Sequence, residues 1–117
     1  MYTLYFSPGA ASLAVHLALL ECSADYRLER IDIESGAQRS AEYLKLNPNG
    51  VVPTLLIDGK PFYEAAAALM TIADRHPSAG LAPPADSLER AAWYQWIVHL
   101  TNTVQPAFRL WFCGTAV

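Results

Sequence analysis

The chain has 117 residues, which is long enough for one ordinary domain and too short for two. Of these residues, 53% are hydrophobic and 16% are charged, so the chain can bury a good core while carrying less charge than most soluble domains. The formal net charge is −3 and no basic block occurs, so neither nucleic acid nor an anionic membrane surface is expected as a partner.

The two cysteines and the longest apolar run bear on the cellular compartment. Cys22 and Cys113 lie far apart and match no metal or redox spacing, which indicates reduced thiols in a cytoplasmic protein, with Cys22 in the core near a helix end. The best membrane candidate, residues 10–20, is interrupted by Ser12 and His16 and follows no basic region. We therefore expect neither a membrane span nor a signal peptide.

The first third of the chain predicts a strand, a helix and a second strand. Residues 2–6 (YTLYF) are typical of a strand and lead into the turn SPGAAS. From Ala10 the apolar residues recur at helical spacing, and residues 26–33 (YRLERIDI) favour another strand. The predicted core face of the helix comprises Leu13, Leu17 and Leu20, widened by Val15 and Leu19. Three elements within 33 residues match a βαβ unit with a parallel pair of strands.

The middle of the chain predicts a short helix, a hairpin and a longer helix. Residues 40–47 favour the short helix, and residues 54–57 and 62–63 favour strands joined by an Asp-Gly turn signal. Residues 64–76 predict a strong helix that ends before a proline. This order of elements indicates an α/β fold with a thioredoxin-like sheet sandwiched by helices.

The rest of the chain predicts a linker and one more helix. Residues 77–86 contain three prolines and a glycine, which is typical of a linker. Asp86 and Glu89 have capping-box spacing at the start of the helix, and Pro106 predicts a kink near its end. The apolar stripe of this helix comprises Trp93, Ile97, Leu100 and Val104, with Trp96 alongside.

The segment NPNGVVPTLLIDG contains a candidate binding position. Pro53 stands at the head of a predicted strand although it has no N–H to give to a sheet. In the thioredoxin-like topology, a cis bond before Pro53 turns the N–H and C=O of Val52 outward, where they can pair with the backbone of a peptide-like thiol. The alternative is a trans proline that only starts a strand. The topology favours the cis interpretation.

Glu64 and Ala65 begin the helix over residues 64–76 and form a second candidate position. The first N–H groups of a helix have no partner within the helix, so a substrate carboxylate can dock there. Alternatively, Glu64 only complements the helix dipole. The two interpretations are compatible.

The turn SPGAAS at the start of the first helix is the third candidate. A thiol placed there has its pKa lowered by the helix end. Ser7 and Ser12 provide hydroxyls that can donate to a thiolate, although capping is the simpler interpretation of two serines. Ala10 and Ala11 stand where a dithiol oxidoreductase needs cysteines, so dithiol redox chemistry is excluded.

The three histidines do not predict a metal site. His16, His76 and His99 have no Cys, Asp or Glu at ligand spacing. We interpret all three as structural or solvated residues.

Four segments resemble, in order, the successive blocks of bacterial glutathione S-transferases, with the beta type closest: YFSPGAASLAVHLALLE, LKLNPNGVVPTLLIDG, EAAAALMTIADRHP and LAPPADSLERAAWYQWI. The resemblance runs from Met1 to about Phe112, and NP-x-G-x-VP is its most specific part. It implies a thioredoxin-like glutathione-binding domain over residues 1–76 and a linker over 77–86. Residues 87–117 are then the first helix of an incomplete all-helical domain.

The resemblance also implies an activity and an assembly. Members of the family conjugate, reduce or isomerise small electrophiles with glutathione as co-substrate and without a metal, usually as cytoplasmic homodimers. For this chain it implies a homodimer whose contact involves residues 64–75.

Carried over by position, Val52 resembles the residue whose backbone meets the cysteinyl unit of glutathione, followed by the cis proline Pro53. Glu64 resembles the acidic residue that helps to hold the γ-glutamyl end, and Ser12 resembles the serine at the head of the first helix. Five positions depart from the beta-type pattern, which usually has Cys, Lys, Ser, Asn and His where this chain has Ala11, Gly36, Ala65, Val98 and Gln105. At about 0.5–1.5 kcal/mol for each lost hydrogen bond, these departures weaken glutathione binding by several kcal/mol in sum.

Three functional interpretations remain open at this point. The first is a glutathione S-transferase in which the hydroxyl of Ser12 or Ser7 donates a hydrogen bond to the thiolate. The second is a non-catalytic binding or scaffold protein of the same fold with a degenerate glutathione site. The third is an enzyme of this fold that uses another thiol or small peptide. A glutathione titration discriminates between the first two.

Overall fold

The computed structural model describes residues 1–113, except for the side chains of Leu110, Phe112 and Cys113. The chain divides into two compact units, Met1–Ala79 and the segment from Gly80 onward. Gly114–Val117, at the end of the predicted last helix, lie outside the described residues.

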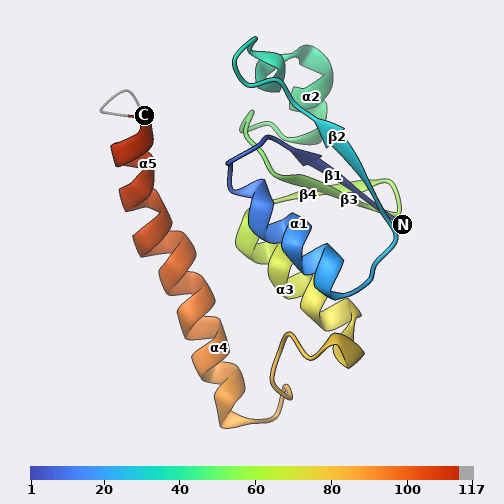
Figure 1. Cartoon of the computed structure of the whole chain (residues 1–117), viewed down its shortest axis with the longest axis vertical. Helices are drawn as coiled ribbons and strands as arrows, with labels where there is room; N and C mark the ends of the chain where they lie inside the picture. Colours follow the sequence, from blue (N-terminus) through green and yellow to red (C-terminus); the bar gives the residue numbers. More distant parts are fainter. Residues whose placement is uncertain (114–117) are drawn as a thin grey trace. The chain divides into compact units, whose positions relative to one another are not determined.

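The first unit is built on a four-stranded sheet with the order β2-β1-β3-β4 (Figure 1). The strands are β1 (Tyr2–Phe6), β2 (Tyr26–Arg30), β3 (Thr54–Ile57) and β4 (Lys60–Tyr63). β1 and β2 are parallel, as the predicted βαβ unit requires, and β3 is antiparallel to both of its neighbours. Asp58 and Gly59 have φ of 50° and 83° and make the predicted tight turn between β3 and β4.

Three helices cover this sheet. α1 (Ser12–Glu21) and α3 (Ala65–Arg75) pack together on one face, whereas α2 (Ala41–Leu46) belongs to the other (Figure 1). The core on the α1 and α3 face consists of fully buried apolar residues: Leu4, Leu55, Val15, Leu19 and Ile72. Alternation along β1 turns Tyr5 to the opposite face, where its ring meets that of Tyr43 from α2. The predicted α/β, thioredoxin-like fold is confirmed.

The core face of α1 differs from the prediction. Leu13, Leu17 and Leu20 are each more than half exposed, whereas the buried side of the helix consists of Ser12, Val15, Ala18 and Leu19. The helix is apolar around most of its circumference, so a stripe at helical spacing exists on more than one side and periodicity alone does not select the buried one. The leucine stripe is therefore a surface of this unit.

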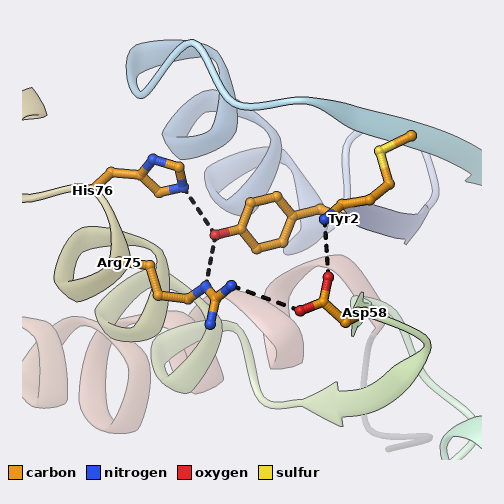
Figure 2. A network of polar contacts seen from close by, with 5 residues as sticks. Tyr2, Asp58, Arg75 and His76 are labelled. Atoms are coloured by element: carbon orange, nitrogen blue, oxygen red, sulfur yellow. Dashed lines mark hydrogen bonds and ion pairs between the residues drawn. The ribbon is translucent and has the colours of Figure 1, made fainter.

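The end of the sheet at which β1 begins and β3 turns into β4 carries a polar network (Figure 2). Tyr2 is buried, and its hydroxyl accepts from Arg75 Nε at 3.1 Å and lies 2.9 Å from His76 Nε2. Asp58 lies 3.9 Å from the Arg75 guanidinium and accepts from the Met1 amine at 3.0 Å. We call this end of the sheet the closed end, since its polar groups find partners within the chain.

Up to Cys113, the second unit consists of a short coil followed by one run of helix. It comprises α4 (Leu88–His99), a π-helical turn (Leu100–Val104) and α5 (Gln105–Cys113). The helix continues through Pro106, where the sequence predicts a kink. The π-helical turn just before it bonds the Gln105 N–H to the Leu100 carbonyl, a wider spacing that accommodates a following proline.

The start of α4 is held by side chains other than the predicted capping pair. The N-cap is Ser87 rather than Asp86, and its hydroxyl donates to the Pro84 carbonyl instead of capping the helix. Arg90 is buried, stacks 4.4 Å from the Trp93 ring and donates to the coil. Within residues 1–113, no helix combines the length and apolar character needed to cross a bilayer.

Candidate functional site

The strand register brings the predicted site residues to one end of the sheet, opposite the closed end. Tyr5 of β1 pairs with Thr54 of β3, which pairs with Tyr63 of β4. Beyond these pairs, the chain continues from β1 to Ser7, enters β3 through Val52 and Pro53, and continues from β4 to Glu64 and Ala65. The turn into α1 lies at this end as well (Figure 1). We call it the open end.

Val52 presents an unpaired backbone at the open end. The bond from Val52 to Pro53 is cis, as the topology predicts, and Pro53 is buried at the head of β3. Neither the N–H nor the C=O of Val52 has a hydrogen-bond partner within residues 1–113. Val52 is only half-buried, and an unpaired backbone donor and acceptor are groups that a ligand can bind.

The loop before Val52 is fastened by side chains that sequence reasoning did not select as functional. The Val51 carbonyl accepts from the Tyr43 hydroxyl at 2.7 Å and from Asn47 Nδ2 at 3.0 Å. The hydroxyl of Thr54 lies 2.6 Å from that of Tyr43. Tyr43, Asn47 and Thr54 are all buried. Of these three residues, the sequence marks only Asn47, through the Asn-Pro turn signal.

Gly50 lets this loop pack closely. It has φ of 63°, and a Cβ at this position would come 3.2 Å from the Gln38 carbonyl oxygen and 3.3 Å from Leu44 Cδ2. Glycine alone meets both conditions without strain. The glycine of the NP-x-G motif thus has a local structural cause.

Ser7 and Ser12, which are predicted to donate a hydrogen bond to a thiolate, both hold the turn into α1. Ser12 Oγ accepts from the Ser7 N–H and donates to the Ser7 carbonyl, each at 3.2 Å. Ser7 Oγ donates to the Ile31 carbonyl at 2.5 Å. Both side chains are buried, so either hydroxyl must release a backbone carbonyl before it can donate to a ligand.

The start of α1 opens toward this end without a side-chain cap. Its N-cap is Ala11, which has no polar side-chain atom to offer. In the described part of the chain, the N–H groups of Ala11 and Ser12 have no acceptor, whereas that of Ala10 donates to the Ser7 carbonyl at 3.3 Å. The free N–H groups and the helix dipole make a positive potential here.

Glu64 adopts a backbone conformation that its sequence does not predict. As the N-cap of α3 it has φ of 76° and ψ of 112°, outside the regions that residues with a Cβ prefer, which costs about 1–3 kcal/mol. Its exposed carboxylate has no hydrogen-bond partner among the described residues, and neither do the N–H groups of Ala65 and Ala66. A carboxylate acceptor and two amide donors therefore lie together at one helix start.

Three other departures from the beta-type pattern fall in other segments of the chain. Gly36 has φ of 82° in the loop after β2, with nothing near its Cβ position. Val98 and Gln105 belong to the second unit. No cluster of three His, Cys, Asp or Glu side chains suited to a metal ion occurs in the described part of the chain. His16 and His76 each face a tyrosine hydroxyl instead.

Known proteins resemble this chain over most of its length. The model of the glutathione S-transferase N-terminal domain matches residues 10–75. "Glutathione S-transferase GST-4.5" of Xanthomonas campestris pv. campestris is 36% identical over 113 residues, which cover 97% of this chain and 54% of that protein. Glutathione S-transferase GstA of Escherichia coli O157:H7 is 32% identical over 107 residues, covering 90% of this chain and 53% of the relative.

Solved structures of glutathione transferases also superpose on this chain. A glutathione transferase homologue from Sulfitobacter, solved with bound glutathione, superposes with a TM-score of 0.86 at 36% identity, over 93% of this chain and 52% of that one. The beta-class glutathione S-transferase of Sphingomonas chungbukensis gives 0.85 at 36% identity, over 98% and 58%. The chain thus spans about half the length of these relatives.

Proposed function

The chain belongs to the glutathione S-transferase family, and on that premise we propose that it binds glutathione at the open end and transfers its thiolate to small electrophiles. The observation that carries the proposal is the unpaired N–H and C=O of Val52. The cysteinyl unit of glutathione is flanked by two amides, so its N–H and C=O can pair antiparallel with those of Val52.

The two ends of glutathione have complementary partners in this proposal. The γ-glutamyl end carries an ammonium and a carboxylate. The Glu64 carboxylate takes the ammonium, and the free N–H groups of Ala65 and Ala66 take the carboxylate. The strained φ of Glu64 supports this assignment, because such conformations cluster at ligand sites.

The thiol of a ligand held by Val52 points toward the start of α1, where the helix end lowers the pKa of a thiol. We propose Ser12 as the hydroxyl that donates to the thiolate once it releases the Ser7 carbonyl. Ser7 is the alternative donor and must release the Ile31 carbonyl. Ala11 carries no thiol, so activation here rests on hydroxyl and backbone donors.

The test of glutathione binding alters the ligand rather than the protein. Calorimetric titration of the chain with glutathione is compared with a glutathione methylated on the cysteinyl nitrogen, which cannot donate to the Val52 carbonyl. We expect about threefold to tenfold weaker binding of the methylated peptide, the effect of one ordinary hydrogen bond. S-methylglutathione is the control, since it keeps both amides. Equal affinities for glutathione and the N-methyl peptide would show that the Val52 carbonyl does not bind glutathione.

A non-catalytic glutathione-binding or scaffold protein is the second candidate. It is favoured by the alanines at positions 11 and 65 and by the serine hydroxyls that already donate to backbone carbonyls. A conjugation assay with a generic aryl halide separates the two. Measurable glutathione binding without a rate above the uncatalysed reaction would favour the second candidate. Tighter binding of another thiol or small peptide would instead identify a different co-substrate.

We also propose that the protein is a cytoplasmic homodimer whose contact includes α3, as in the family pattern. Support for a partner comes from the second unit, where Trp96, Leu100 and Trp111 are each more than half exposed. Light scattering on the 117-residue chain tests this proposal. A non-associating monomer that melts cooperatively would show that these side chains need no cover.

A further inference from the structure

The Val51 carbonyl stands out because it accepts two hydrogen bonds from buried side chains. The donors are the Tyr43 hydroxyl at 2.7 Å and Asn47 Nδ2 at 3.0 Å. Asn47 is fully buried and also closes its own loop, since its side-chain oxygen accepts from the Asn49 N–H and its carbonyl accepts from the Gly50 N–H. Two donors from different positions on the chain hold this one carbonyl toward the interior.

The direction of each bond around Tyr43 follows from counting protons. A phenol has one proton, and here it goes to the Val51 carbonyl, which can only accept. Thr54 must then donate its hydroxyl proton to the Tyr43 oxygen across 2.6 Å. Burial raises the pKa of the Tyr43 phenol, so the donor keeps its proton at neutral pH. The ring is fixed in addition by its edge contact with Tyr5.

The orientation of Val51 determines that of Val52. The peptide bond between them is trans, so the C=O of Val51 and the N–H of Val52 lie in one plane and point in opposite directions. Holding the carbonyl inward therefore turns the Val52 N–H outward at the open end. Without the two side-chain donors, this peptide plane could rotate and take the N–H away from a ligand.

We infer that Tyr43 and Asn47 are positioning residues for the thiol peptide ligand, because they hold the Val51–Val52 peptide plane in the orientation that presents the Val52 N–H. The inference rests on the proposed binding of glutathione by Val52. Neither residue touches the ligand in this account. Their effect is to keep the protein in the competent orientation before the ligand arrives, and the apparent affinity scales with that competent fraction.

The test compares Tyr43→Phe with Thr54→Ala. Both variants remove one hydroxyl from the same buried pair, and Thr54→Ala also removes a buried methyl group, so both lose stability. Only Tyr43→Phe removes a donor from the Val51 carbonyl, since in Thr54→Ala the tyrosine still donates to it. We expect an apparent Kd for glutathione about threefold to tenfold higher in Tyr43→Phe, and within about twofold of the parent in Thr54→Ala.

A second measurement decides the inference without any ligand. The ¹⁵N and ¹³C NMR signals of the Val52 amide and the Val51 carbonyl report the peptide plane in the free protein. They should shift or broaden in Tyr43→Phe and stay near the parent positions in Thr54→Ala. If the parent binds no glutathione, the proposed function falls while these signals still test the role of Tyr43. Equal changes in both variants, or none in Tyr43→Phe, would overturn the inference.

Discussion

The two ends of the sheet are built from the same strands but treat their polar groups in opposite ways. At the closed end, Tyr2, Asp58, Arg75 and His76 find partners within the chain (Figure 2). At the open end, the backbone of Val52 and the carboxylate of Glu64 have none among the described residues. A polar group removed from water without a partner costs free energy, so only water or a ligand offsets that cost at the open end.

This difference separates stability from binding. A substitution at the closed end removes a bond present in the free protein, so it lowers the free energy of unfolding and leaves glutathione binding unchanged. A substitution of an unpaired group at the open end changes binding and leaves stability unchanged or higher. Ser12 is an exception worth testing, because it lies at the open end and yet is bonded within the chain.

The largest effect is expected for Ser12→Ala. It removes one acceptor and one donor from the buried backbone of Ser7, and we expect a loss of about 2–3 kcal/mol in the free energy of unfolding. If Ser12 also donates to the thiolate, the conjugation rate with a generic electrophile falls beyond what lost stability explains. Denaturant unfolding and initial rates measure the two effects.

Ser7→Ala is the matched control, since it removes a single bond to the Ile31 carbonyl. Its stability loss should be the smaller of the two. Only one serine can be the main thiolate donor, so the two variants should differ in rate. Unchanged, equal rates in both would remove serine activation from the proposed mechanism.

Tyr2→Phe tests the closed end. The variant keeps the ring in the core and removes the oxygen that joins Arg75 to His76, so we expect a loss of about 1–2 kcal/mol. For a domain of this size that lowers Tm by roughly 4–16 °C. The Kd for glutathione should stay that of the parent. A clear change in Kd without any change in Tm would contradict the separation of the two ends.

Much of the fold could be predicted from the sequence, for physical reasons that also explain what could not. A short apolar run located β3, and an Asp-Gly pair marked the turn after it, since both are local properties. The core face of α1 could not be selected, because the helix is apolar on several sides. The Tyr43 bond to Val51 and the strained φ of Glu64 depend on packing, and no local residue pattern predicts them.

Glu64→Gly and Glu64→Ala test two features of the open end, the carboxylate of Glu64 and its backbone conformation. Both remove the carboxylate, so both should bind glutathione about tenfold more weakly, the worth of one charged hydrogen bond. They should differ in stability, because glycine adopts φ of 76° freely and alanine does not. We expect Glu64→Gly to be about 1 kcal/mol more stable than Glu64→Ala by chemical denaturation. Equal stabilities would mean that the backbone at position 64 is not strained in solution.

The smallest effect is expected for Asp58→Asn at the closed end. The pKa of Asp58 lies below its ordinary value, first because the Met1 amine donates a hydrogen bond to the carboxylate and then because of the amine and Arg75 charges. A lowered pKa in the folded state adds stability that is complete above the ordinary Asp pKa of about 4 and is lost as the pH falls through the lowered value. Asparagine accepts the φ of 50° at this turn, so the variant removes the charge and keeps the hairpin.

The parent should therefore be slightly more stable than Asp58→Asn at pH 6, and the two stabilities should converge as the pH falls toward 2. Acetylation of the Met1 amine should abolish most of the difference, since the amine is its main cause. A difference that persists unchanged at low pH would show that the turn itself, rather than the charge, is responsible.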